Sequence, residues 1–188
     1  MKRTATILLV LFCSFFILRA DTHAEEDRSP KIILDNGMTV LMTEMPSSPV
    51  VSVYAFVKAG SATEGKFLGT GISHFLEHML FKGTHGKGVG EIARRIQAVG
   101  GEINAATSKD YTIYTITVPH EQIDVALGIL ADMLMNAKMD AEEVNKEREV
   151  IFSEIRLHDD NPDSEIQEIL YKNVYLNHPY RHPILGYD

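Results

Sequence analysis

The segment from Gly71 to Phe81 constrains this chain most strongly, because it places ionisable side chains on one helical face within an apolar sequence. On a helix, His74 and His78 are four residues apart, so both imidazoles project from the same face. Glu77 lies on the flank of that face. The other side chains of the segment are mostly large and apolar: Phe75, Leu76, Met79, Leu80 and Phe81. The pattern predicts a helix over 72–81 whose polar stripe lies at a buried edge.

Two imidazoles at this spacing suit one Zn²⁺, which binds histidine nitrogen at about 2.0–2.1 Å. Glu77 would then lie close to a zinc-bound water without being a ligand itself. The order H-x-x-E-H is the reverse of the H-E-x-x-H pattern found in zincins. The alternative is a surface helix with two solvated histidines, which the apolar neighbours disfavour.

A catalytic zinc usually has three protein ligands and one open position. The chain has a single Cys, near its start, so the third ligand should be a histidine or a carboxylate. The helix predicted from Asp140 to Leu157 offers Glu147 and Glu154, seven residues apart and therefore on one face. Glu147 belongs to a charged run that is typical of a solvated face, whereas apolar residues surround Glu154. A carboxylate there is costly unless it is paired or metal-bound, but spacing alone leaves its role open.

The first residues predict a targeting signal. Lys2 and Arg3 precede an apolar run from Ala5 to Leu18, which is shorter than the roughly 20 residues of a membrane-spanning helix. We expect a secretory signal peptide over residues 1–24, cleaved after Ala20 or Ala24. An uncleaved membrane anchor is the alternative; after cleavage no stable membrane span is expected.

The rest of the chain alternates strand and helix patterns and predicts an α+β fold, with a mainly antiparallel sheet packed against helices. A hairpin is expected over 31–42, and strands over 50–58, 102–107 and 111–118. Further helices are expected over 91–99, 120–137, 140–157 and 161–175. A formal net charge of −8 makes nucleic acid an unexpected partner.

Several sequence blocks together resemble the N-terminal signature of the M16 zinc metallopeptidases, the family of pitrilysin, insulinase and the mitochondrial processing peptidase. They are Ala59–Thr84, Gly100–Ala105, Asp110–Tyr114, Glu147–Ile155 and His178–Gly186. The resemblance implies an M16 N-terminal catalytic domain over 31–188, of the LuxS/MPP-like metallopeptidase fold. It implies one zinc ion held by His74, His78 and Glu154, with Glu77 as general base. Glu147 would support the site from behind the ligands.

The resemblance also implies how substrate and partners bind. A peptide would add as a strand to the sheet edge that carries Asn104 and Ala105, although a turn-capping role for the Asn104 side chain is an alternative. A second homologous domain or subunit would close over the peptide. The N-terminal catalytic domain itself is expected to be truncated at its C-terminus, because the chain ends just past the His178–Gly186 block. The remaining histidines are expected at the surface or in loops: His85, His120, His158, His178 and His182.

These features together predict a zinc-dependent metalloendopeptidase that acts on peptides or unfolded segments. The alternative is a non-catalytic or inefficient M16-like subunit or fragment that needs a partner domain. The intact H-x-x-E-H and Glu154 favour the enzyme. By family habit the expected location is the periplasm, with secretion or membrane anchoring as alternatives.

Overall fold

The structure, a computed structural model, describes residues 30–187. The predicted signal peptide therefore lies outside the described residues. The chain divides after Ser47 into two units, and each is described by itself. The first contains an antiparallel hairpin of β1 (Lys31–Ile33) and β2 (Thr39–Leu41). Its turn includes Gly37 at φ 84°, a left-handed conformation that glycine adopts without steric cost. The predicted hairpin is confirmed.

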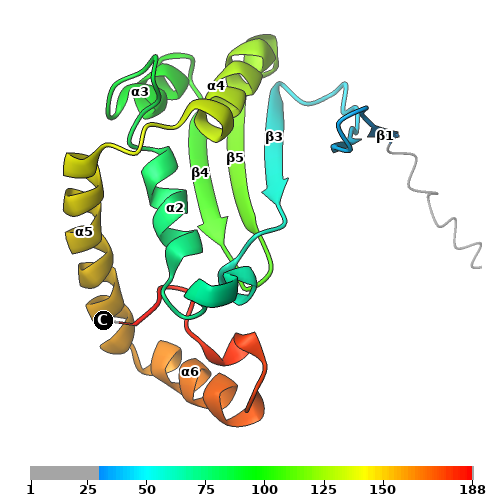
Figure 1. Ribbon diagram of the computed structural model, residues 1–188. Coiled ribbons are helices and arrows are strands. Elements are labelled where there is room, and N and C mark those ends of the chain that lie inside the picture. The colour runs from blue at the N-terminus through cyan, green and yellow to red at the C-terminus, as the bar shows by residue number, and fades with distance from the viewer. Residues whose placement is uncertain (1–29, 188) are drawn as a thin grey trace, which may run out of the picture. The chain divides into compact units, whose positions relative to one another are not determined.

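The second unit is built on a three-stranded antiparallel sheet (Figure 1). Its strands are β3 (Val50–Val57), β4 (Glu102–Thr107) and β5 (Thr112–Pro119), in the order β3-β5-β4. The last strand in sequence therefore lies in the centre, and β4 pairs with β5 along one side only. This arrangement confirms the predicted α+β class.

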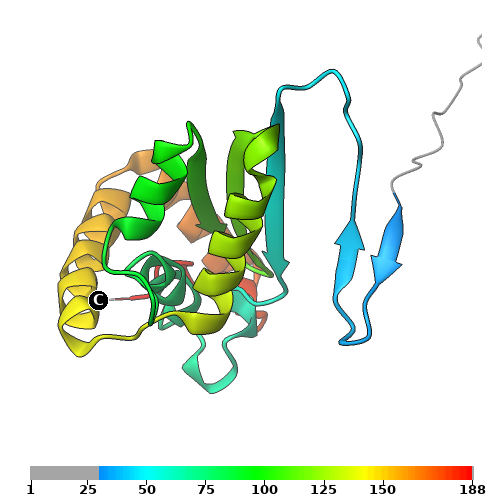
Figure 2. The same cartoon turned by 90° about the horizontal axis from the view of Figure 1, so that it is seen from above.

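Five α-helices complete the described part of the second unit. They are α2 (Ile72–Leu80), α3 (Glu91–Ala98), α4 (Ile123–Asn136), α5 (Ala141–Asp159) and α6 (Pro162–Val174). Helix α4 lies along one face of the sheet, which Figure 2 shows from above. Helix α2 lies between β4 and α5 (Figure 1) and packs against both. No helix among residues 30–187 is both long and apolar enough to cross a membrane.

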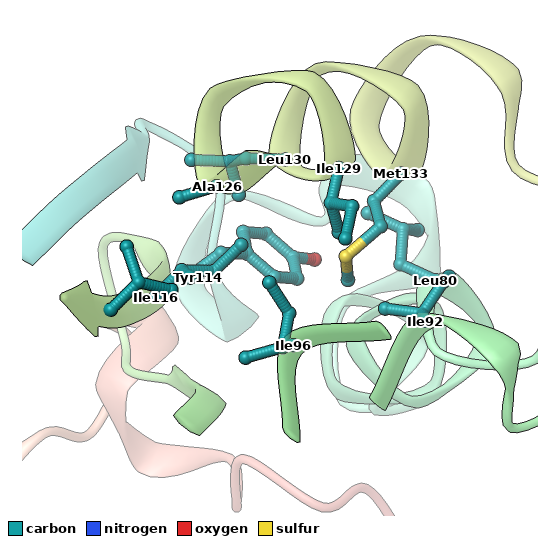
Figure 3. Close-up of a cluster of buried hydrophobic side chains, with 10 residues drawn as sticks. Leu80, Ile92, Ile96, Tyr114, Ile116, Ala126, Ile129, Leu130 and Met133 are labelled. Carbon is teal, nitrogen blue, oxygen red and sulfur yellow. The ribbon is translucent and has the colours of Figure 1, made fainter. Parts of the chain in front are cut away.

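The hydrophobic core lies between the sheet and helices α3 and α4 (Figure 3). Strand β5 alternates as predicted, with Tyr114, Ile116 and Val118 buried on the helix side. They meet side chains that recur on one face of each helix: Ile92 and Ile96 from α3, and Ala126, Ile129, Leu130 and Met133 from α4. Leu80 joins the same cluster from the end of α2. The core therefore fixes α2 against the sheet.

Replacing a central core side chain should destabilise the fold strongly. Ile116 is fully buried, so Ile116→Ala is expected to lower the free energy of unfolding by about 2–5 kcal/mol. Ile166→Ala is the matched control, because Ile166 is 65% exposed on α6, and it should change stability by less than about 0.5 kcal/mol. Urea unfolding followed by circular dichroism measures both. Equal effects of the two substitutions would contradict this assignment of the core.

The predicted element ends differ from the observed ones where short 3-10 turns intervene. Two of them, Ser61–Thr63 and Gly65–Phe67, lie between β3 and α2. The helix predicted to begin at His120 starts with a 3-10 turn and becomes α-helical only at Ile123. Asp140 caps α5, its side chain accepting a hydrogen bond from the Glu142 backbone at 3.0 Å, and α5 continues two residues beyond the predicted Leu157.

Candidate active site

Helix α2 carries the H-x-x-E-H residues and is fixed at its start by a close backbone contact. Gly71 precedes the helix at φ 69°. A Cβ at this position would lie 2.1 Å from the carbonyl oxygen of Leu185. Only glycine therefore allows the C-terminal loop to lie so close to the beginning of α2. The helix is thus held between the sheet, α5 and this loop.

Three side chains from α2 and α5 converge on one point. The Nε2 atoms of His74 and His78 are 3.2 Å apart. Glu154 Oε2 lies 3.8 Å from His74 Nε2 and 3.5 Å from His78 Nε2. Ligands of a tetrahedral zinc at about 2.0–2.2 Å are themselves separated by about 3.3 Å. The donor types and their spacing therefore fit a single zinc ion.

The two histidines lie in a partly dry environment. Their side chains are 13% (His74) and 18% (His78) exposed, whereas that of Glu154 is 38% exposed. Burial, helped by the neighbouring His78, lowers the pKa of His74 to about 4. His74 is therefore neutral near pH 7, and neutral imidazole is the form that binds a metal. Among the described residues its buried Nδ1 has no hydrogen-bond partner.

Glu77 lies beside this group, at 8% exposure, and is held by the sheet. Its Oε2 accepts a hydrogen bond from Thr107 Oγ1 at 2.7 Å. Thr107 is the last residue of β4, so the end of an edge strand reaches the candidate base. Burial, together with the charge of Glu77, raises the pKa of Tyr114 to about 12. The hydrogen bond from Thr107 orients the Oε2 atom of Glu77.

Glu147 packs against His78 and is 4% exposed, so the solvated face expected for it from the charged run is wrong. Its Oε1 accepts a hydrogen bond from His78 Nδ1 at 2.8 Å, which leaves the Nε2 lone pair of His78 directed at His74 and Glu154. Its other oxygen, Oε2, forms an ion pair with Lys82 Nζ. Burial alone would raise the pKa of Glu147, but the hydrogen bonds from Lys82 and His78 outweigh it and hold that pKa below its usual value.

The sequence interpretation did not include Thr107 or Lys82. Lys82 follows His78 by four residues, and this spacing could have indicated a side chain on the same side of α2. Thr107 carried no such local signal, because its contact with Glu77 depends on how β4 packs against α2. Thr107 thus contacts Glu77 directly, and Lys82 contacts Glu147, the hydrogen-bond partner of His78.

Asn104 and Ala105 lie on β4, the strand that leads to Thr107. The Asn104 side chain is exposed, and its Oδ1 accepts a hydrogen bond from the Ala105 backbone at 2.8 Å. This contact lies within the strand rather than at a turn, so the turn-capping alternative for Asn104 is not what the structure has. Within the sheet of the second unit, the outer edge of β4 has no strand partner.

The other histidines lie away from this group. His85, His120 and His178 are exposed, and His182 is half-buried. His158 is also half-buried, and its Nδ1 lies 3.4 Å from Glu168 Oε1 and 3.9 Å from Asp159 Oδ1. These three residues are close enough to share a metal ion, which spacing did not indicate because Glu168 lies on α6. Lys172, also on α6, pairs with Glu168, so Glu168 contacts both His158 of α5 and a lysine of its own helix.

Comparison with known proteins gives consistent results. The family model described as "Insulinase (Peptidase family M16)" matches residues 39–188. An uncharacterized zinc protease of Bacillus subtilis, YmxG, is 40% identical over 151 residues, covering 80% of this chain and 37% of the relative. An uncharacterized zinc protease of Rickettsia felis is 44% identical over 153 residues, covering 81% of this chain and 37% of the relative. The chain therefore spans little more than a third of the length of these relatives.

A more distant relative and two solved structures agree. A probable mitochondrial-processing peptidase β subunit of Arabidopsis thaliana is 34% identical, covering 81% of this chain and 29% of that protein. A protease from Helicobacter pylori superposes with a TM-score of 0.80 at 29% identity, covering 85% of this chain and 39% of that one. An M16 inactive domain from Pseudomonas fluorescens, with a TM-score of 0.77 at 22% identity over 85% of this chain and 39% of that one, shares the fold. The match of the family model over residues 39–188 shows that the chain belongs to the M16 (insulinase) family of peptidases.

Proposed function

We propose that this chain is the zinc-binding part of a metalloendopeptidase that hydrolyses peptide bonds in peptides or unfolded segments. One observation carries the proposal: two histidine nitrogens and one carboxylate oxygen lie 3.2–3.8 Å from one another. A second carboxylate, Glu77, is on the same helix, one residue before His78. The names of the relatives, zinc proteases, support the choice of metal.

The residues divide the chemistry between them. His74 and His78 from α2 and Glu154 from α5 would hold the zinc ion. When bound, zinc lowers the pKa of a water molecule towards 7 and polarises the carbonyl group of the peptide. Glu77 accepts the proton of the attacking water and returns it to the leaving amine, as a general base and then a general acid. Thr107 keeps the Glu77 carboxylate oriented, and Glu147 keeps His78 oriented.

We further propose that the substrate peptide adds to β4 as an extra strand. The unpaired outer edge of β4 supports this, because such an edge offers free backbone groups to an extended peptide. The strand ends at Thr107, in contact with Glu77, so a peptide along this edge would be led towards the candidate base. Asn104 and Ala105 would line that edge, and the Asn104 side chain would have to release the Ala105 backbone N–H if the peptide uses it.

The greater length of the relatives supports the proposal that this chain acts with a second domain or subunit. Because the chain spans about 37% of their length, a second homologous domain or subunit would complete the substrate chamber. The expected setting is the periplasm, with secretion or membrane anchoring as the alternatives. Nucleic acid is not an expected partner, since the net charge is −8.

Removing the hydroxyl of Thr107 should slow hydrolysis without releasing zinc. The Thr107→Val variant loses a hydrogen bond to a carboxylate, worth about 1.5–3 kcal/mol, so kcat should fall by about 10–100-fold. Thr107→Ser should restore most of the rate, because it keeps the donor. Thr117→Val is the matched control on β5, where the hydroxyl contacts Ser52 instead. Steady-state kinetics and zinc content measure these effects; an unchanged kcat in Thr107→Val would contradict the orienting role.

The proposed function is tested with a quenched fluorescent peptide and the full chain, with and without a zinc chelator. We expect cleavage that the chelator abolishes and that added zinc restores. Bound zinc without cleavage, alone and with a partner domain added, would favour the alternative of a non-catalytic subunit. Cleavage that survives full removal of zinc would contradict the proposal.

A further inference from the structure

Lys82 lies just beyond the end of α2, and its Nζ pairs with Oε2 of Glu147 on α5. Its side chain is 26% exposed, whereas that of Glu147 is 5% exposed. The Lys82 side chain also lines a cavity of about 580 Å³, together with residues of the 84–89 loop and the start of α5. The Lys82 ammonium group is therefore partly solvated, whereas the Glu147 carboxylate with which it pairs is buried.

The Glu147 carboxylate is held at both oxygens. Oε2 pairs with Lys82 Nζ and Oε1 accepts the hydrogen bond from His78 Nδ1. A buried carboxylate is costly without a partner cation, and its rotation is restricted when each oxygen has a fixed donor. The orientation of the His78 ring depends in turn on Oε1. The contacts thus form a series from Lys82 through Glu147 to His78 Nε2.

We propose that Lys82 is a positioning residue for zinc: by holding Glu147, it fixes the orientation and tautomer of His78 in which Nε2 faces His74 and Glu154. The inference rests on the proposed function, in which these three residues bind zinc. Groups that hydrogen-bond to metal-ligating histidines in this way contribute to metal affinity although they do not touch the metal. Lys82 acts one contact further out.

The inference makes a prediction opposite in sign to that of simple electrostatics. A lysine near a divalent cation repels it, so removing the charge of Lys82 should by itself tighten zinc binding. If Lys82 acts by positioning Glu147, the same substitution weakens zinc binding, because the buried carboxylate loses its cation and no longer fixes His78. The direction of the change therefore separates the two roles.

The experiment measures the dissociation constant of zinc for the full chain, by competition with a chromophoric zinc chelator at fixed pH and salt. Lys82→Met is expected to weaken binding by about 10–100-fold. Lys82→Arg should stay within about threefold of the original chain, since it keeps the cation and the adjoining cavity leaves room for the larger group. Lys146→Met is the matched control: Lys146 lies on α5 next to Glu147 in sequence but pairs with Glu142 and Glu143 at the surface. It should leave zinc affinity unchanged.

A double variant tests whether Lys82 acts through Glu147. In a Glu147→Gln background there is no carboxylate to hold, so Lys82→Met should cause no further loss of zinc affinity. Losses that add in the double variant would overturn the inference, as would zinc binding in folded Lys82→Met that equals or exceeds that of the original chain. The thermal midpoint of the zinc-free proteins shows whether each variant folds. If Lys82→Met does not fold, Lys82→Gln replaces it, with the same two outcomes.

The controls also separate this inference from the proposed function. The His78→Ala chain gives the background from zinc bound elsewhere, including the group around His158. If the original chain binds no more zinc than His78→Ala, the proposed zinc site fails and the inference fails with it. If the original chain binds zinc and Lys82→Met binds it equally well, only the role of Lys82 is wrong.

Discussion

Glu77→Gln is expected to keep zinc and lose hydrolysis. The amide has nearly the shape of the carboxylate and can still accept the hydrogen bond from Thr107, so the fold and the three ligands should be undisturbed. An amide cannot take a proton from water, however, and general base catalysis is typically worth about 10²–10⁴-fold in rate. Peptide hydrolysis and zinc content, measured on the same preparation, check both halves of this prediction.

The contrast with His78→Ala makes the first prediction specific. His78→Ala removes one of the proposed ligands, so zinc and hydrolysis should be lost together. Glu77→Gln should lose hydrolysis alone. Full activity in Glu77→Gln would refute the role of Glu77, and loss of zinc from it would mean that Glu77 is a ligand rather than a base.

Glu154→Gln should lose most of its zinc. Glu154 is the only anion among the three converging donors and reaches them from α5, 3.5 Å from His78 Nε2. Neutralising it removes both a ligand and a charge. We expect zinc affinity to fall by more than the roughly 100-fold that loss of an outer partner can cost. A competition titration with a zinc chelator measures the change.

Glu149→Gln is the matched control for Glu154→Gln. It makes the same chemical change on the same helix, but the Glu149 side chain is 71% exposed. Zinc affinity should stay within about twofold of the original chain, because screening by solvent makes a distant surface charge count for little. Equal zinc affinities of the two variants would mean that the third ligand is not Glu154.

The local part of the site could be predicted from the sequence because helix geometry fixes it. Residues at positions i and i+4 must lie on one face, so the pairing of His74 with His78 needed only the helix itself. Strand β5 was predictable for the same kind of reason, because alternation between buried and half-buried residues follows from the period of a strand. Nothing else in the chain has to be known for these two predictions.

The long-range part could not be predicted from spacing. Glu147 and Glu154 lie on the same face of α5. Only the packing of α5 against α2 decides that Glu154 lies near the Nε2 atom of His78 whereas Glu147 contacts its Nδ1 atom. The resemblance to a known family assigned Glu154, which spacing had left open. Thr107 and Lys82 had no assignment from either source, because their contacts depend on how a strand end and a helix end meet neighbouring elements. The sheet order β3-β5-β4 belongs to the same class.

The most direct test of the zinc site is X-ray absorption at the zinc edge, on the full chain loaded with one equivalent of zinc. We predict two histidine nitrogens and additional oxygen ligands at about 2.0–2.2 Å, and His78→Ala should lose this signature. A site with one histidine or none, or a spectrum that His78→Ala leaves unchanged, would contradict the proposed zinc site.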